Sequence, residues 1–167
     1  MITLTKPVFE TLIKHLIYIE ESSDSLADFY FPDSPKEQEE IKDFFRVYIK
    51  KIENEMEHAK VVSIFTKVPC LDMLNTFPFV IIGSEVGLET ASCKTAYNCR
   101  VIHTDSQTNV KNGITFLSPI GRSLLLRNAG SEIDIGIGNN IGSNINSSLC
   151  ASAEMQRVKI KTIKLLA

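Results

Sequence analysis

The first 61 residues repeat apolar side chains with the period of two amphipathic helices. Between residues 5 and 61 these side chains recur at alternating three- and four-residue steps, which is the spacing of a buried helical stripe. The stripe positions are Phe9, Leu12, Leu16 and Ile19, followed by Ile41, Phe45, Tyr48, Ile49, Ile52, Met56 and Ala59. The pattern predicts an N-terminal antiparallel coiled-coil hairpin.

The turn of this hairpin is predicted near residues 29–34. Pro32 disfavours helix in the residue before it, and Ser34 to Glu37 reads as a capping box with Pro35 in the first turn. At 1.5 Å per residue each arm would be about 33 to 40 Å long. The tip would therefore lie far from the base of the hairpin. The aromatic run at residues 29–31 either caps the end of the hairpin core or is available to plug a channel.

The second half of the chain changes to short apolar runs with turn signals between them. Strands are predicted from the apolar pattern at residues 114–117 and 133–135. We interpret residues 66–78 as a linker, because prolines interrupt helix at both ends of that segment. The predicted fold class is thus two-domain α + (α+β), with a hairpin at residues 1–65 and a β-sheet domain with a short helix at residues 79–167.

A short helix is predicted after the strand at residues 114–117. Ser118 is a good N-cap, and Pro119 suits the first helical position, where a missing N–H has no cost. Leu124 to Leu126 would supply the buried face, and Gly130 would close the helix in a left-handed conformation. The Gly/Asn/Ser-rich residues 136–148 are interpreted as a mobile loop, with a specific contact as the alternative.

Charge separates the two halves. Residues 1–65 hold 8 Lys/Arg and 13 Asp/Glu, a net charge of −5, whereas residues 66–167 hold 10 and 7, a net charge of +3. Residues 20–40 contain eight acids and only Lys36 as a base. Phosphate binding requires cations, so direct nucleic-acid binding by this half is not expected. The acids form either a solvated helical surface or an element suited to a basic channel or a metal centre.

The remaining residue types exclude several functions. The spacing of Cys70, Cys93, Cys99 and Cys150 matches no zinc pattern, so we interpret them as reduced, structural thiols. His15 and His58 could approach each other near the hairpin base, but two ligands do not make a metal site. No phosphate-binding or dinucleotide loop is present, and no run approaches the ~20 apolar residues of a membrane span. The opening residues lack a leader pattern, so a cytoplasmic protein is expected.

The order of motifs in the second half resembles the C-terminal domain of Gre-type transcript cleavage factors, the GreA/GreB family. The resemblance covers residues 79–135 and centres on Ser118-Pro119-Ile120-Gly121-Arg122-Ser123-Leu124-Leu125, followed by the turn at residues 130–132. It implies a first strand at residues 79–86, a strand and loop at residues 100–105, and a closing strand at residues 158–163. An acidic-tipped helical hairpin followed by an FKBP-like domain is also the layout of that family.

The resemblance implies a function. Gre-type factors bind bacterial RNA polymerase with the globular domain at the mouth of the secondary channel and the hairpin inside it. Tip acids then help hold a second Mg²⁺ of the polymerase active site, whose chemistry needs hard oxygen ligands. The factor would have no enzymatic activity, cofactor or metal of its own. By resemblance, Asp105 and residues 118–122, including Ser118, Pro119 and Arg122, would face the polymerase rim.

The tip of this chain departs from the family pattern Gly-Asp-Leu-x-Glu-Asn. Asp33 and Glu37 are its nearest matches, with one extra residue between them, and Asp28 ends the first arm as a further candidate. Glu37 would be either a cap or a ligand, and Asp33 either a ligand or a solvated surface acid. Each arm is also shorter than is typical by roughly one heptad, about 10 Å.

Three functions therefore follow from the sequence. The first is a factor that stimulates transcript cleavage in backtracked complexes, with Asp33 as its principal acid. The second is a non-catalytic, Rnk-like regulator that occupies the channel and competes with cleavage factors. The third, a prolyl isomerase or peptide-binding module, is disfavoured because Phe79, Tyr97 and Phe116 are the only aromatic side chains beyond the linker, too few for an aromatic-lined pocket.

Overall fold

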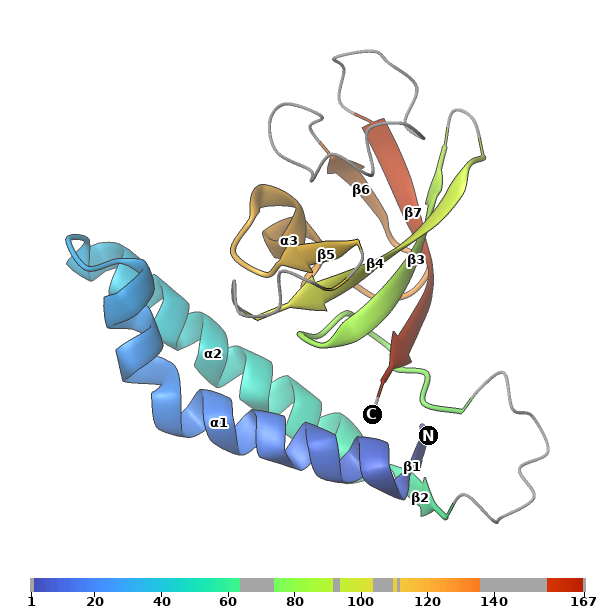
Figure 1. The fold of residues 1–167 in the computed structure, drawn as a ribbon, viewed down its shortest axis with the longest axis horizontal. Coiled ribbons are helices and arrows are strands. Elements are labelled where there is room, and N and C mark those ends of the chain that lie inside the picture. The colour runs from blue at the N-terminus through green and yellow to red at the C-terminus, as the bar shows by residue number, and fades with distance from the viewer. Residues whose placement is uncertain are drawn as a thin grey trace. The chain divides into compact units, whose positions relative to one another are not determined.

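The chain forms two compact units in a computed structural model. The structure describes residues 2–63, 74–91, 94–103, 110, 112–135 and 156–166. The first unit comprises Met1–Asn75 with Ala167, and the second comprises Thr76–Leu166 (Figure 1). Most of the predicted linker at residues 66–78, and all of the predicted loop at residues 136–148, lie outside the described residues.

The first unit is a two-helix hairpin, as the apolar spacing predicts. Helix α1 spans Lys6–Tyr30 and helix α2 spans Pro35–Met56 (Figure 1). The short turn between them contains Pro32, and Pro35 is the first residue of α2. Between the helices lie side chains that are almost completely buried: Leu12, Leu16, Ile19, Phe45, Tyr48 and Ile52. All six belong to the predicted stripe, so the stripe is the core of the hairpin.

A small parallel strand pair closes the base of the hairpin, and the sequence pattern does not reveal it. Strand β1 (Thr3–Thr5) pairs with β2 (Lys60–Val62). The side chain of Leu4 is fully buried there, and the Thr5 amide donates to Asn75 Oδ1 at 2.8 Å. Three-residue strands are too short to show an alternating pattern, which is why they escape prediction.

The second unit is a curled, mixed five-stranded sheet. Its strands are β3 (Ser84–Thr90), β4 (Ala96–Ile102), β5 (Gly113–Thr115), β6 (Glu132–Ile135) and β7 (Gln156–Leu165), in the order β5-β4-β3-β7-β6. All neighbours are antiparallel except β4 and β5 (Figure 1). Ile133 and Ile135 are buried while Glu132 and Asp134 are exposed, which confirms the alternation predicted for this strand.

The predicted strand at residues 79–86 is wrong over its first half. Strand β3 begins only at Ser84, after a turn in which Gly83 has φ of +92°. The preceding Phe79, Val80, Ile81 and Ile82 are buried without belonging to the sheet. Val80 instead exchanges backbone hydrogen bonds with Leu126 and Arg127, which follow helix α3 (Pro119–Leu124), at 2.8 and 2.9 Å. A continuous apolar run indicates burial on all sides, and burial alone does not specify a strand.

Helix α3 spans Pro119–Leu124, and its start is the predicted one. Ser118 Oγ accepts from the Gly121 amide at 3.0 Å and donates to the Thr115 carbonyl at 2.7 Å. Gly130 has the predicted positive φ, +88°, but the predicted helix end there is wrong. The last helical residue is Leu124, Leu125 is the C-cap, and Leu126 takes the left-handed conformation with φ of +61°. The hydrogen bond from the Leu126 amide to Val80 O holds this unfavourable conformation in place.

Candidate functional site

The hairpin tip is a tight turn held by one carbonyl oxygen. The carbonyl of Phe31 accepts from the Ser34 amide at 3.2 Å and from Gln38 Nε2 at 2.8 Å. The amide of Phe31 in turn donates to Ala27 O at 3.0 Å and caps α1. These bonds fix the path of Pro32 and Asp33 between the helices, so Asp33 has a defined position at the extreme end of the hairpin.

The three candidate acids surround this turn. Asp28 lies in the last turn of α1, Asp33 in the turn itself, and Glu37 in the first turn of α2, where the helix dipole favours a negative charge. All three are exposed. Within the described parts of the chain, none of their carboxylates takes part in a hydrogen bond or ion pair, which leaves their oxygen atoms available to an external ligand.

Other acids of the same segment are paired on the helices. Asp24 bonds Lys42 at 2.9 Å across the two arms, Glu40 lies 3.7 Å from Lys36, and Glu39 lies 3.8 Å from Arg46. The hydrogen bond to Asp24 raises the pKa of Lys42, so this lysine stays charged. Ion pairs therefore neutralise part of the negative charge along the helices. They neutralise none of the charge of Asp28, Asp33 and Glu37 in the described structure.

The predicted capping box is absent from the tip. Ser34 is the N-cap residue of α2, but its side chain makes no capping hydrogen bond. Its amide donates to Phe31 O, so Glu37 is not needed to satisfy it. The prediction failed because the amide that a capping box would use is already bound by the turn. Glu37 was considered either as a helix cap or as a metal ligand, and this geometry excludes the capping role.

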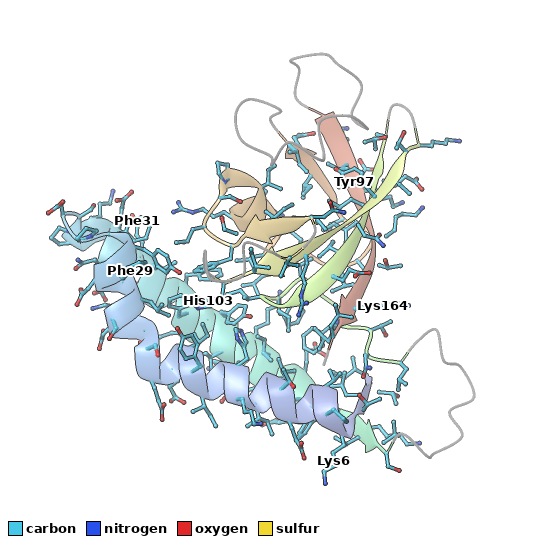
Figure 2. All side chains as sticks on the ribbon, in the orientation of Figure 1. Lys6, Phe29, Phe31, Tyr97, His103 and Lys164 are labelled. Carbon is cyan, nitrogen blue, oxygen red and sulfur yellow. The ribbon has the colours of Figure 1, made fainter. Side chains whose placement is uncertain are left out.

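An aromatic side chain stands beside these acids. Phe29 has 76% of its surface exposed and meets Tyr30 edge-on, with ring centroids 5.3 Å apart. Figure 2 shows Phe29 and Phe31 at the end of the hairpin opposite Lys6. The sequence suggested that the aromatic run caps the hairpin core, but Phe29 does not. Its exposure depends on how α1 is rotated about its axis, which the apolar spacing near the helix end does not define.

The structure brings no metal centre together in the described ranges. Among those residues, no group of three or more His, Cys, Asp or Glu side chains could hold a metal ion. His15 Nε2 lies 2.9 Å from the Tyr48 hydroxyl, and His58 Nδ1 lies 3.2 Å from Asn54 O, so the two histidines face different partners.

The candidate contact residues of the second unit have different structural roles. Ser118 is occupied as the N-cap of α3, and Pro119 is its first residue. Arg122 lies in the last turn of α3 and is exposed. Asp105 lies outside the described residues. Ser118 and Pro119 therefore set the position of Arg122, which is the member of this group that presents a charge to solvent.

The thiols are described only at Cys99. Its side chain is buried, and burial raises the pKa of the thiol to about 12. A thiol in such an environment is protonated at neutral pH and unreactive. Cys70, Cys93 and Cys150 lie outside the described residues. No helix in the described ranges is both long and apolar enough to cross a bilayer.

Comparison with known proteins gives matches only among solved structures. No family model matches the sequence, and no curated protein matches it either. The prokaryotic transcription elongation factor GreA/GreB from Nitrosomonas europaea is similar over 98% of this chain and 99% of its own, with 18% identity and a TM-score of 0.42.

Two Gfh1 proteins are also similar. Gfh1 of Thermus thermophilus, a GreA factor homologue, matches over 97% of both chains with 16% identity and a TM-score of 0.38. Gfh1 of Thermus aquaticus matches over 98% of this chain and 97% of its own, with 16% identity and a TM-score of 0.39. The structural neighbours thus bear the name of the family that the sequence motifs resemble.

Proposed function

We propose that this protein is a Gre-type transcription factor that binds bacterial RNA polymerase at its secondary channel and stimulates transcript cleavage in backtracked complexes. In this proposal the coiled-coil hairpin enters the channel. The second unit, an FKBP-like domain, stays at the rim with Asp105 and residues 118–122 toward the polymerase. The protein acts in the cytoplasm as an accessory factor without enzymatic activity of its own.

The observation that carries the proposal is the set of unpaired carboxylates at the hairpin tip. Asp28, Asp33 and Glu37 are exposed and free of ion pairs in the described structure, while Asp24, which lies further back from the tip on α1, is neutralised by Lys42. At 1.5 Å per residue, the 25 and 22 residues of α1 and α2 extend over about 37 and 33 Å. Charged groups presented at the end of such a narrow rod suit a task inside a deep channel.

The donor set fits a shared magnesium ion. Mg²⁺ is bound in proteins by one or two carboxylates together with water and substrate phosphates, and an open tip with few ligands matches that requirement. A bound ion there would stabilise charge on a phosphodiester undergoing hydrolysis. Asp33, held by the turn, would accept a hydrogen bond from the attacking water and orient it. Glu37 or Asp28 would supply the second carboxylate.

A second candidate function is supported by the tip itself. The exposed ring of Phe29 next to the acids suits a plug that fills the channel. Under this alternative the protein is a non-catalytic competitor of cleavage factors. Both functions require the same binding site on the polymerase, and they differ only in the chemistry at the tip.

A transcript cleavage assay separates the two functions. Backtracked elongation complexes of the same organism's RNA polymerase would be incubated with wild-type protein, Asp33→Asn or Glu21→Gln in the presence of Mg²⁺. Glu21 is the matched control, because it is an exposed acid of α1 away from the tip. We expect Asp33→Asn to slow cleavage by about tenfold or more, about 1.4 kcal/mol in activation free energy, and Glu21→Gln to have no effect.

Three other outcomes of this assay would change the proposed function or the role of Asp33. Cleavage at the wild-type rate by Asp33→Asn would remove Asp33 from its proposed role. No cleavage by any variant, together with inhibition of an authentic Gre factor, would establish the competitor. Neither cleavage nor inhibition would contradict the proposed function altogether.

A further inference from the structure

A groove runs along one face of the hairpin between its two helices. It has a volume of about 980 Å³ and is lined only by residues of α1, α2 and the turn that follows α2. The side chains of Leu16 and Phe45 form its floor and are almost completely buried. The groove therefore lies over the hairpin core and is separate from the acids of the tip.

Aliphatic side chains on both helices form part of the groove's walls and are accessible. Ile13 and Ile17, one helical turn apart on α1, are 37% and 47% exposed. Ile49 and Met56, two turns apart on α2, are half-buried on the other side. Helical side chains at these spacings form a continuous stripe, so the groove presents a strip of aliphatic surface that is about two turns long.

Some of the charges around the groove are satisfied within the hairpin. The Lys42–Asp24 ion pair at 2.9 Å joins the two arms at the end nearer the tip, and the Lys42 side chain is only 24% exposed. Arg46 is paired on its own helix with Glu39 and Asp43. The charges of Lys42 and Arg46 are thus balanced by carboxylates of the hairpin itself, although the Arg46 side chain is 68% exposed.

The remaining charges are mostly acidic. Glu20, Glu53 and Glu57 border the groove together with Lys50, and none of the four forms an ion pair in the described ranges. Their formal sum is −2. Two copies of the hairpin packed through this face would bring acidic borders together, and nucleic acid would bring further negative charge. Charge complementarity therefore favours a cationic partner.

We propose that this groove binds a single basic amphipathic helix of RNA polymerase. The aliphatic stripe of that helix packs against Ile13, Ile17 and Ile49, and its flanking lysines or arginines face Glu20 and Glu53. This is the helix-in-groove mode of recognition, in which apolar side chains at helical spacing supply affinity. The source of the helix rests on the proposed function, whereas its chemistry follows from the groove.

Site-specific photo-cross-linking identifies the occupant. Full-length protein carrying Ile17→p-benzoylphenylalanine would be irradiated with core RNA polymerase, and Val47→p-benzoylphenylalanine is the matched control. Val47 is 60% exposed on α2 and does not line the groove. We expect position 17 to cross-link to one amphipathic, Lys/Arg-flanked helix of the polymerase, and position 47 not to reach that helix.

Affinity provides the second readout. We expect Ile17→Ser to weaken binding to core polymerase about tenfold, or about 1.4 kcal/mol, and Val47→Ser to change it less than twofold. Both side chains are exposed, so neither change should unfold the hairpin, and thermal unfolding would verify this.

Failure of the groove inference and failure of the proposed function are distinguishable. A complex that forms normally with Ile17→Ser overturns the groove alone. A cross-link from position 17 to residues 76–166 of the same chain, or to a second copy of the chain, also overturns the groove inference. So does the absence of any cross-link from position 17 when the complex with polymerase does form. Absence of any complex between wild-type protein and polymerase overturns both.

Discussion

At the scale of single residues, ion pairing separates the acids of the hairpin into two groups. Asp24 is neutralised by Lys42, whereas Asp33 has no charged partner in the described structure. The composition of residues 20–40 indicated a strong excess of acid but could not show which members remain unpaired, because cross-arm contacts depend on the rotation of each helix. The sequence thus supplied the candidate residues, but it could not show that they lack an ion-pair partner.

His103 gives the second unit a predictable response to pH. Burial lowers the pKa of this histidine, whose ring packs against Phe116 with centroids 5.3 Å apart. An unfolded histidine titrates near pH 6.5, so the unfolded chain takes up the proton first as the pH falls. The stability from the neutral ring is therefore complete above about pH 6.5 and declines below it.

We expect the melting temperature of the second unit to fall between pH 7.5 and pH 5.5, and His103→Gln to reduce that fall. Calorimetry of both proteins at the two pH values measures the difference. An unchanged pH dependence in the variant would show that other groups dominate it.

At the scale of elements, the close contact between α3 and β5 explains a residue of the recognised motif. A Cβ atom at Gly121 would collide with the Thr115 carbonyl oxygen and would lie 2.8 Å from Phe116 Cα. Both neighbours are backbone atoms, which cannot move aside as a side chain can. Only glycine fits at this position, so the glycine of the Ser-Pro-Ile-Gly sequence is a packing requirement.

We expect Gly121→Ala to destabilise the second unit by about 1–3 kcal/mol, in the range of overpacked sites. Ser123→Ala in the same short helix is the control and should change stability by less than about 0.5 kcal/mol. The two variants would be compared by chemical denaturation followed by circular dichroism. Equal stability of Gly121→Ala and wild type would mean that α3 can move away from β5.

The elements differ in how well the sequence predicted them. The ends of α1 and α2 at the turn followed from apolar spacing and from the two prolines, and the start of α3 followed from Ser118 and Pro119. The predicted stripe ran too far at the other end, because α2 stops at Met56 and Ala59 lies outside the helix. The strand proposed from residue 79 was wrong because a uniformly apolar run does not distinguish a strand from buried irregular chain. The base strands β1 and β2 are too short to have a pattern.

At the scale of the whole molecule, the two units carry different candidate features. The hairpin carries the unpaired acids at its tip and the aliphatic groove along its side. The second unit carries the Ser118-to-Arg122 motif on a curled mixed sheet. Strong features of sequence, such as helical periodicity and capping, predicted this division into a hairpin and a sheet. The groove was not predictable, because it depends on which stripe positions remain uncovered when the two helices pack.

The most direct test of the central claim is displacement of an authentic Gre factor from core RNA polymerase. A fluorescently labelled cleavage factor would be bound to the polymerase, and unlabelled protein would be added while anisotropy is recorded. We predict that wild-type protein displaces the labelled factor completely and that Asp33→Asn does so equally well, because Asp33 acts in the chemical step. Retention of the labelled factor at saturating protein would contradict binding at the secondary channel.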